Sequence, residues 1–406
     1  MNLSYFISKR INKDHEGSFS ASIGRIAVAS IAVGLASALV AFLILRGFQT
    51  TIVDKIYGFA GHMQISRYTL KSNNFDEPPI SLTSDFYTHW KEYDFVTHVQ
   101  PIGYKMGILK TEEAVLGVVF KGVTKDFDST RFTPSLVKGH FPHFSDSTYS
   151  LEVLLSQRIA DKLEKDIGDE VIMYVVQNPP RFRRLSIAGI YETGLEDFDD
   201  RIILGDLGLV QRLNNWPDSL VGGYEVFLRD PSDMEAAENE MYDVLDSDLY
   251  ADTADNKYFQ IFEWLQMLDR NVAIFLVLIL FVASFNMVSF LLILIMERTN
   301  MIGVLKGLGA TDLTVRRIFS WNGMRLIARG MLWGNVIAGG LGLLQSQFHI
   351  IPLDAASYYM HYVPIYWDWW AIVLVNILTF VVVNLTLFIP TTVIINIRPI
   401  AAIKFD

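Results

Sequence analysis

Four long apolar stretches divide the chain, and each is long enough to form a helix that crosses a membrane. Residues 26–45 contain no charged side chain, and residues 271–296 and 371–390 are dominated by apolar side chains. A weaker stretch covers residues 326–344 and is interrupted by Arg329. About 20 apolar residues in a helix cross the ~30 Å hydrocarbon core of a bilayer, so the pattern predicts four transmembrane helices. A signal peptide is the alternative for the first stretch, but its apolar core would be shorter than this run.

The weakest stretch carries small residues at a helical spacing. Gly330, Gly334, Ala338 and Gly342 recur every four residues, which places them on one face of a helix. In a bilayer such a face lets another helix approach closely. We therefore predict a helix-packing face here, and a re-entrant or surface segment is the alternative.

The basic residues predict the orientation of the spans. Lys and Arg concentrate in residues 1–25, 297–325 and 391–406, which lie on one side of a four-span chain. The positive-inside rule makes that side cytoplasmic, so residues 46–270 and the loop 345–370 are predicted to be exported.

The exported segment is the largest region outside the predicted spans, and it shows mixed patterns. It holds 22 Lys and Arg against 37 Asp and Glu, a net charge of −15, while the rest of the chain carries +5. An acidic segment argues against nucleic-acid binding, which needs a basic face. The runs that read as strands are 115–120, 171–176, 185–191 and 223–228, and those with helical spacing are 154–163 and 234–245. We predict an α+β domain inserted between transmembrane helices 1 and 2.

A hairpin in this domain has a basic tip. Residues 177–184 separate two strand-like runs and include the candidate tip residues Pro179, Pro180, Arg181 and Phe182. Proline and a charged cluster between two apolar runs are typical of an exposed turn.

Candidate chemistry in the exported domain is sparse. Glu196, Asp197, Asp199 and Asp200 form an acidic cluster that suggests Ca²⁺, but no EF-hand spacing frames them, so a solvated hairpin tip is the favoured interpretation. His140 and His143 are separated by a proline and cannot share a regular helix face, so no metal site is predicted. The chain has no cysteine, no serine-hydrolase elbow, no zinc-protease motif and no phosphate-binding loop. We therefore predict no active site.

A short amphipathic helix follows the second span. Ile302, Leu305 and Leu308 recur every three residues, Gly307 and Gly309 can end the helix, and Thr311 or Asp312 can cap the next one. From the spacing alone, a helix that docks on a cytoplasmic motor and an ordinary amphipathic linker are equally supported.

Several segments together resemble a known family. The run from Ser284 through Thr299, then residues 302–310 and 316–319, closely resembles the LolC/LolE lipoprotein-releasing permeases, part of the FtsX/MacB-like group of ABC-transporter permeases. Residues 46–65 resemble the segment after that family's first span, and residues 189–194 resemble a strand and turn of its exported domain.

The resemblance implies a non-catalytic permease subunit of the bacterial inner membrane. Two permease chains, identical or paralogous, would pair with two copies of a separate ATPase that binds ATP and Mg²⁺, and this chain would hold no cofactor. The cargo would be a lipoprotein that is passed to a periplasmic carrier. The carrier-gripping hook of LolC-type subunits is reduced here to about eight residues, which implies a LolE-like subunit or a homodimer. The residues implied to couple to the ATPase are Glu297, Arg298, Met301, Ile302, Leu305, Lys306 and Leu308, with Glu297 and Lys306 pairing at the rim.

Acyl chains need apolar area and adaptable side chains, so we expect them near the outer ends of spans one and two. The candidates for lipoprotein binding are Phe42, Leu45, Phe48, Met267, Leu268, Phe275 and Leu276. Two alternatives to lipoprotein release remain: a related permease for efflux or for force transmission to periplasmic partners, and a membrane-anchored sensor or enzyme.

Overall fold

The computed structural model describes residues 19–68, 78–112, 114–144, 149–175, 177, 179–231, 234–354, 358, 360–392 and 394. The chain forms two compact units. The helical unit comprises residues 1–50, 264–352 and 362–406, and the sheet unit comprises residues 51–263 and 353–361. Each unit is described by itself.

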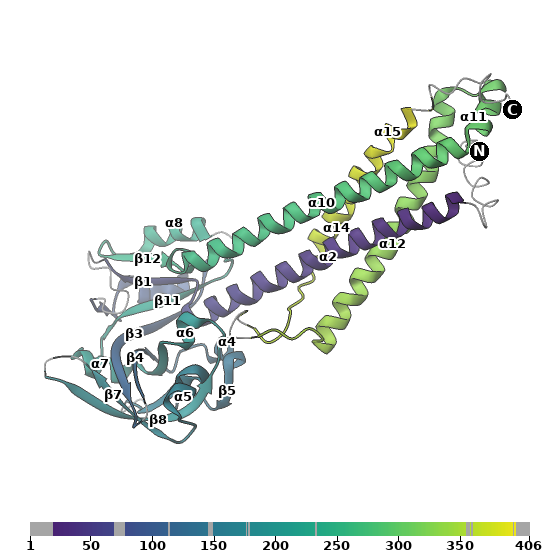
Figure 1. The fold of residues 1–406 in the computed structure, drawn as a ribbon. Helices are drawn as coiled ribbons and strands as arrows, with labels where there is room; N and C mark the ends of the chain where they lie inside the picture. The colour runs from purple at the N-terminus through teal and green to yellow at the C-terminus, as the bar shows by residue number, and fades with distance from the viewer. Residues whose placement is uncertain are drawn as a thin grey trace. The chain divides into compact units, whose positions relative to one another are not determined.

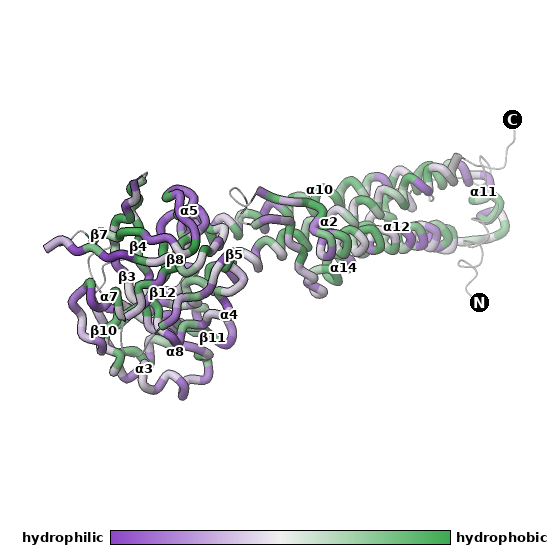
Figure 2. The backbone as a smooth tube through the Cα atoms, turned by 90° about the horizontal axis from the view of Figure 1, so that it is seen from below, coloured by the Kyte–Doolittle hydropathy of each residue, from purple (hydrophilic) through white to green (hydrophobic). Residues whose placement is uncertain are grey.

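Four helices are long and apolar enough to cross a membrane, as the sequence predicts. Their bounds are α2 Phe19–Ala60, α10 Phe259–Glu297, α12 Asp312–Phe348 and α14 Trp369–Thr386, the last followed by the short α15 Phe388–Thr391 (Figure 1). Hydrophobic residues dominate the long helices (Figure 2). The weak third stretch lies inside the continuous helix α12 and is not a re-entrant loop.

Two of these helices extend well beyond the predicted spans. α2 has 42 residues and α10 has 39, so at 1.5 Å per residue each is roughly 60 Å long, about twice the hydrocarbon thickness. Residues 46–60 and 259–270, which were predicted to belong to the α+β domain, are therefore helical. α2 ends at Gly61, whose φ of +74° suits glycine and whose N–H donates to Tyr57 O at 2.9 Å.

The sheet unit is built on a ten-stranded mixed sheet in the order β12-β1-β11-β3-β4-β9-β6-β8-β5, with β7 paired to β3 and β8. The pairs β4–β9 and β6–β8 are parallel and the other pairs are antiparallel. The strands are β1 Met63–Arg67, β3 Val96–Lys110, β4 Val115–Val123, β5 Leu136–Gly139, β6 Glu152–Ser156, β7 Glu170–Val175, β8 Arg181–Tyr191, β9 Ile202–Asp206, β11 Gly223–Leu228 and β12 Leu249–Thr253, and the short β2 Ile80–Ser81 and β10 Leu220–Val221 pair separately.

Short helices pack on this sheet and complete its core. They are α3 Asp85–His89, α4 Ser129–Phe132, α5 Gln157–Leu163, α6 Glu196–Asp199, α7 Leu207–Asn214, α8 Met234–Val244 and α9 Ala254–Lys257. Apolar side chains of α5, α7 and α8 join those of the strands in one buried cluster. The predicted α+β domain between the first and second long helices is confirmed.

One predicted helix in this unit is half wrong. The spacing of residues 154–163 predicts a helix throughout, whereas the structure has strand β6 up to Ser156 and α5 only from Gln157. The strand is buried on both faces, and such a continuous apolar run has no period that separates it from a buried helix. Ser156 Oγ accepts a hydrogen bond from Ile159 N at 3.0 Å and so caps the helix at the change.

Candidate functional site

The turn between α10 and α12 contains a short helix, as the sequence predicts. α11 spans Thr299–Gly307, and the chain then turns at Gly309, whose φ is +91°. Thr311 is the N-cap of α12, since its Oγ1 accepts from Thr314 N at 3.3 Å. These caps hold α11 between two long helices as a separate segment.

α11 presents two different faces. Ile302 is fully buried and packs in one cluster with Val315 and Phe319 of α12, so it contributes to the interior of the unit. Val304, by contrast, is 49% exposed and Leu308 is 80% exposed. Leu313, at the start of α12, is 64% exposed. We call these three exposed residues the α11 surface.

The predicted coupling residues therefore divide. Glu297 and Leu308 are exposed, while Arg298, Met301 and Leu305 are partly buried. The expectation that Ile302 faces a partner is wrong, because the side chain is needed in the core.

Lys306 also differs from its prediction. Its Nζ lies 2.8 Å from Asp312 Oδ1 and donates to Ile394 O at 2.7 Å, and the side chain is only 10% exposed. Lys306 thus contacts Asp312, three residues after Gly309, and the end of the described chain, and these contacts were not predicted.

The small-residue ladder of α12 lies against α2. A Cβ added at Gly330 would lie 2.7 Å from Ile31 Cβ, and one at Gly334 would lie 3.0 Å from Ala32 O. All four ladder residues are buried. The two helices thus approach along a face that tolerates no larger side chain.

The candidate lipoprotein-binding residues do not form one surface. Met267 is 50% exposed and Phe275 is 45% exposed, whereas Leu45 and Leu276 are buried. Phe42, Phe48 and Leu268 are partly buried. Leu45 and Leu276 therefore belong to helix packing, and the spacing along a helix that is apolar all round could not separate them from the exposed members.

The segment after the predicted first span holds α2 against its neighbours in the helical unit. A Cβ at Gly47 would lie 2.6 Å from Pro364 O. Phe48 packs edge-to-face on Trp264 with ring centroids 5.6 Å apart, and Gln49 Nε2 donates to Leu265 O at 3.2 Å. Gly47 and Gln49 entered the sequence analysis through resemblance and Phe48 also as a candidate for lipoprotein binding, and the contacts give all three a packing role.

The hairpin is tighter than predicted. β7 and β8 pair up to Val175 opposite Arg181, so the residues from Arg181 onward lie in a strand and not in the tip. Arg181 donates to Arg212 O at 2.8 Å and to Asn215 Oδ1 at 2.6 Å. Phe182 is 65% exposed. Pro179 and Pro180 are exposed and remain in the turn.

The acidic cluster is not a solvated hairpin tip. Asp199 is buried, and its carboxylate accepts hydrogen bonds from Thr193 N, Thr193 Oγ1 and Gly194 N at 2.7–3.1 Å. Burial raises the pKa of Asp199, and these hydrogen bonds partly offset that rise. Asp200 instead pairs with Lys162 at 3.2 Å. Asp199 and Asp200 are thus used internally to hold the turn after β8, whereas Glu196 and Asp197 are exposed.

A polar network that the sequence did not predict lies under β3, β4 and β11. Lys121 Nζ is 2.6 Å from Glu225 Oε1, and both side chains are fully buried. Lys121 also donates to Phe59 O, and Gln100 Nε2 donates to Glu225 Oε2 at 2.8 Å. Burial lowers the pKa of Lys121, and Glu225 opposes that shift.

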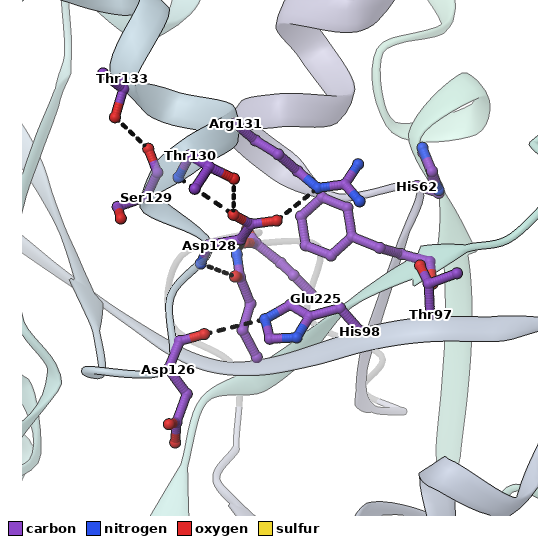
Figure 3. A network of polar contacts seen from close by, with 12 residues as sticks. His62, Thr97, His98, Asp126, Asp128, Ser129, Thr130, Arg131, Thr133 and Glu225 are labelled. Atoms are coloured by element: carbon purple, nitrogen blue, oxygen red, sulfur yellow. Dashed lines mark hydrogen bonds and ion pairs between the residues drawn. The ribbon is translucent and has the colours of Figure 1, made fainter.

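The network continues to α4 (Figure 3). Gln100 Oε1 accepts from Asp128 N at 3.1 Å, and Asp128 Oδ2 pairs with Arg131 Nε at 2.8 Å. The Arg131 guanidinium lies 4.6 Å from the centre of the Phe227 ring. The buried His62 Nδ1 accepts from Leu228 N at 2.7 Å. Burial, with a smaller effect of Arg131, lowers the pKa of His62 to about 4.

His140 and His143 are closer than the sequence predicts. They lie on one loop with ring centroids 4.9 Å apart, and His143 N donates to Glu152 Oε2 at 2.9 Å. The proline between them excludes a helix, as expected, but the loop brings the two rings together.

Two known protein families match the chain, and together they cover most of both units. The MacB-like periplasmic core domain matches residues 26–244, more than half of the chain, and the FtsX-like permease C-terminal domain matches residues 273–399. The chain is 22% identical over 357 residues to the lipoprotein-releasing system transmembrane protein LolE of Haemophilus influenzae, covering 86% of this chain and 84% of that protein. It is 21% identical over 422 residues to LolC of Xylella fastidiosa strain 9a5c, covering 100% and 98%.

Among solved structures, the periplasmic region of MacB from Actinobacillus actinomycetemcomitans is 16% identical and covers 52% of this chain and 97% of that one, with a TM-score of 0.36. The resemblance inferred from the sequence is confirmed by the two domain matches. Permeases of the FtsX-like family pair with an ABC ATPase. The chain therefore belongs to the FtsX/MacB-like family of ABC-transporter permeases, as a multi-pass, non-catalytic subunit with a periplasmic domain.

Proposed function

We propose that this permease subunit extracts lipoproteins from the outer leaflet of the bacterial inner membrane for transfer toward the outer membrane. The observation that carries the proposal is the extent of the similarity to LolC and LolE, which runs through the exported domain and all four spans. A second permease chain, the same or paralogous, completes the membrane part. A periplasmic carrier accepts the cargo.

The energy comes from ATP and Mg²⁺ bound to the partner ATPase. Its docking site is the α11 surface, because Val304, Leu308 and Leu313 expose apolar area beyond the membrane-spanning part of α10. An amphipathic helix that offers one apolar face to a partner groove is a recurring recognition mode.

The orientation of the chain follows from the Lys and Arg asymmetry. Reporter proteins fused at residue 15, residue 310 or after residue 400 should report cytoplasm, and fusions near residue 150 should report periplasm. An exported signal at residue 310 would contradict the proposed docking site.

The cargo site is tested by photocrosslinking from the exposed candidates. A crosslinking amino acid at Phe275 or Met267 should capture a triacylated lipoprotein without ATP and release it after ATP and Mg²⁺ are added to the complete transporter. Leu276 is the matched control on the same helix, because its side chain is buried and should crosslink to protein.

The alternative within the family is an efflux or force-transmitting permease. If Phe275 and Met267 crosslink only phospholipid, with no dependence on ATP, lipoprotein release is rejected in favour of that alternative. The membership of the permease family would not be affected by this outcome.

A further inference from the structure

We propose that His140, His143 and Glu152 bind a divalent transition-metal ion of the zinc class in the periplasmic domain. Their ligand atoms all lie within 4.8 Å of one another. Within the described part of the chain, this is the one group of three or more histidine and carboxylate side chains that meets that distance. The inference does not depend on the identity of the cargo.

The backbone holds both histidines in place before any ion binds. Gly139 ends β5 with a φ of +80°, and a Cβ there would lie 2.3 Å from Ala188 O. His140 N then donates to Ala188 O at 3.1 Å. The loop is therefore fixed to β8 immediately before the first ligand.

The loop is anchored again between the two histidines. The Phe141 ring stacks on Phe127 with centroids 5.4 Å apart, and Pro142 is buried. His143 N donates to Glu152 Oε2 at 2.9 Å, which fixes the second ligand to the start of β6. Both imidazoles are exposed, so packing does not require them, although the backbone that presents them is held on each side.

The hydrogen bonds suit metal binding by the rings. His140 Nδ1 lies 3.0 Å from Phe141 O. When Nδ1 donates to that carbonyl, the lone pair is on Nε2, and such an outer hydrogen bond is usual for histidines that bind metals. His143 Nδ1 already lies 3.4 Å from Glu152 Oε2. Ligands of a tetrahedral ion with bonds of about 2.0–2.1 Å lie roughly 3.4 Å apart, so small side-chain rotations complete the site.

The ligand types select the ion. Two imidazoles and one carboxylate suit Zn²⁺, Cu²⁺ or Ni²⁺, whereas Ca²⁺ and Mg²⁺ prefer oxygen ligands throughout. Three protein ligands leave a fourth position open to water or to a group from a partner. The ion would join the loop after β5 to the first residue of β6, since both strands pair with β8.

The first test is zinc titration of the full-length protein in detergent, purified without a histidine tag and treated with a chelator. We expect one Zn²⁺ per chain in competition with a zinc-sensitive dye. His140→Ala, His143→Ala and Glu152→Gln should each weaken binding by more than about 10-fold, the lower end of what loss of an outer-shell partner costs, because each removes a ligand. His89→Ala is the matched control, because His89 is another exposed histidine of this unit and its ring contacts Asp85 and Thr88.

A second measurement uses the wild-type chain and therefore needs no variant to fold. Zn²⁺ should protect His140 and His143, but not His89, from modification by diethylpyrocarbonate, as measured by mass spectrometry of peptides. Equal modification with and without Zn²⁺ overturns the proposal. Unchanged zinc affinity in a folded His140→Ala, His143→Ala double variant overturns it as well.

Discussion

The two units of this chain pair polar side chains in different ways. In the helical unit the partly buried and uncharged Asn335 and Asn376 exchange hydrogen bonds of 2.7 and 3.0 Å between α12 and α14. In the sheet unit Lys121 and Glu225 form a fully buried ion pair. A neutral amide pair satisfies its polar atoms without placing charge in lipid, where a charge costs several kcal/mol.

The side chains that fill the interior also differ between the two units. The helical unit brings backbones together through small residues such as Gly330 and Gly334, because lipid offers no hydrophobic gain for burying larger side chains. The sheet unit buries large aromatic and branched residues around its network. Small residues thus set how closely the helices pack in the helical unit, whereas the sheet unit also holds a buried charge that must keep its partner.

The largest effect should come from breaking the ion pair. Lys121→Met leaves the Glu225 carboxylate buried without its partner, which should destabilise the sheet unit by about 3–5 kcal/mol. Denaturant unfolding of the full-length protein in detergent, followed by proteolysis at sites within residues 78–253, measures this change. Lys138→Met is the control, because Lys138 pairs with Asp166 on the surface, where both side chains are more than half exposed.

Adding Glu225→Gln to Lys121→Met removes the orphaned charge and should recover part of the loss. A Lys121→Met variant no less stable than Lys138→Met would contradict the view that the buried Glu225 carboxylate needs its charged partner.

Steric crowding should have the next largest effect. Gly330→Ala places a methyl group against Ile31 and should destabilise the helical unit by about 1–3 kcal/mol. Gly339→Ala on the same helix is the matched control, since nothing lies within 4 Å of a Cβ at Gly339. Unfolding in detergent, followed by tryptophan fluorescence, compares the two. Equal stabilities of the Gly330→Ala and Gly339→Ala variants would mean that α2 does not pack closely against the small residues of α12.

A pH effect of about 1–2 kcal/mol should arise from His62. Its pKa is about 4 in the folded chain and about 6.5 when unfolded. The unfolded chain therefore takes up a proton first, and stability falls as the pH drops from about 6.5 to 4, with no contribution above that range. The measurement is the unfolding midpoint of the sheet unit between pH 7 and pH 5.

The structural cause is that protonation places a charge in a buried site near Arg131, and the protonated Nδ1 can also no longer accept the Leu228 N–H. His62→Gln keeps an acceptor in the side chain and should flatten this part of the pH profile. A profile identical to that of the wild type would assign the loss to other groups.

The smallest effect on stability is expected at the α11 surface. Leu308→Asp should leave the fold intact, because the side chain is 80% exposed, while abolishing permease-stimulated ATP hydrolysis in the complex. Ile302→Asp on the same helix is the contrasting variant and should destabilise the helical unit, since that side chain is buried. Normal stimulation by the Leu308→Asp complex would rule out this docking site.

The sequence predicts the parts of the fold that depend on local periodicity. The four apolar stretches, α8 and β11 follow from spacing, and α11 follows from glycines placed after a short apolar repeat. The full lengths of α2 and α10 do not follow, because residues such as Asp54 and Glu263 lie outside the apolar stretches and were assigned to the α+β domain although they continue a helix. An apolar stretch predicts which residues can lie in the membrane, but it does not predict at which residue the helix ends.

The site residues were harder to predict because they depend on contacts distant in sequence. Lys121 and Glu225 are 104 positions apart on strands that are not even neighbours in the sheet. The proximity of His140, His143 and Glu152 requires the β5–β8–β6 pairing. Ile302 and Leu308 occupy equivalent positions in the apolar repeat. Ile302 is buried because it packs against α12, whereas Leu308 is exposed, and the repeat alone does not predict this difference.

The two contacts of Lys306 have a thermodynamic consequence. The same ammonium group binds Asp312 at the start of α12 and the carbonyl of Ile394 after the fourth span. A ligand of α11 that draws Lys306 away from Ile394 changes the equilibrium between the attached and released forms of that segment. By reciprocity, a change in attachment alters the affinity of the ligand by the same factor. Lys306 therefore provides a direct physical link between the turn that joins the second and third long helices and the chain after the last one.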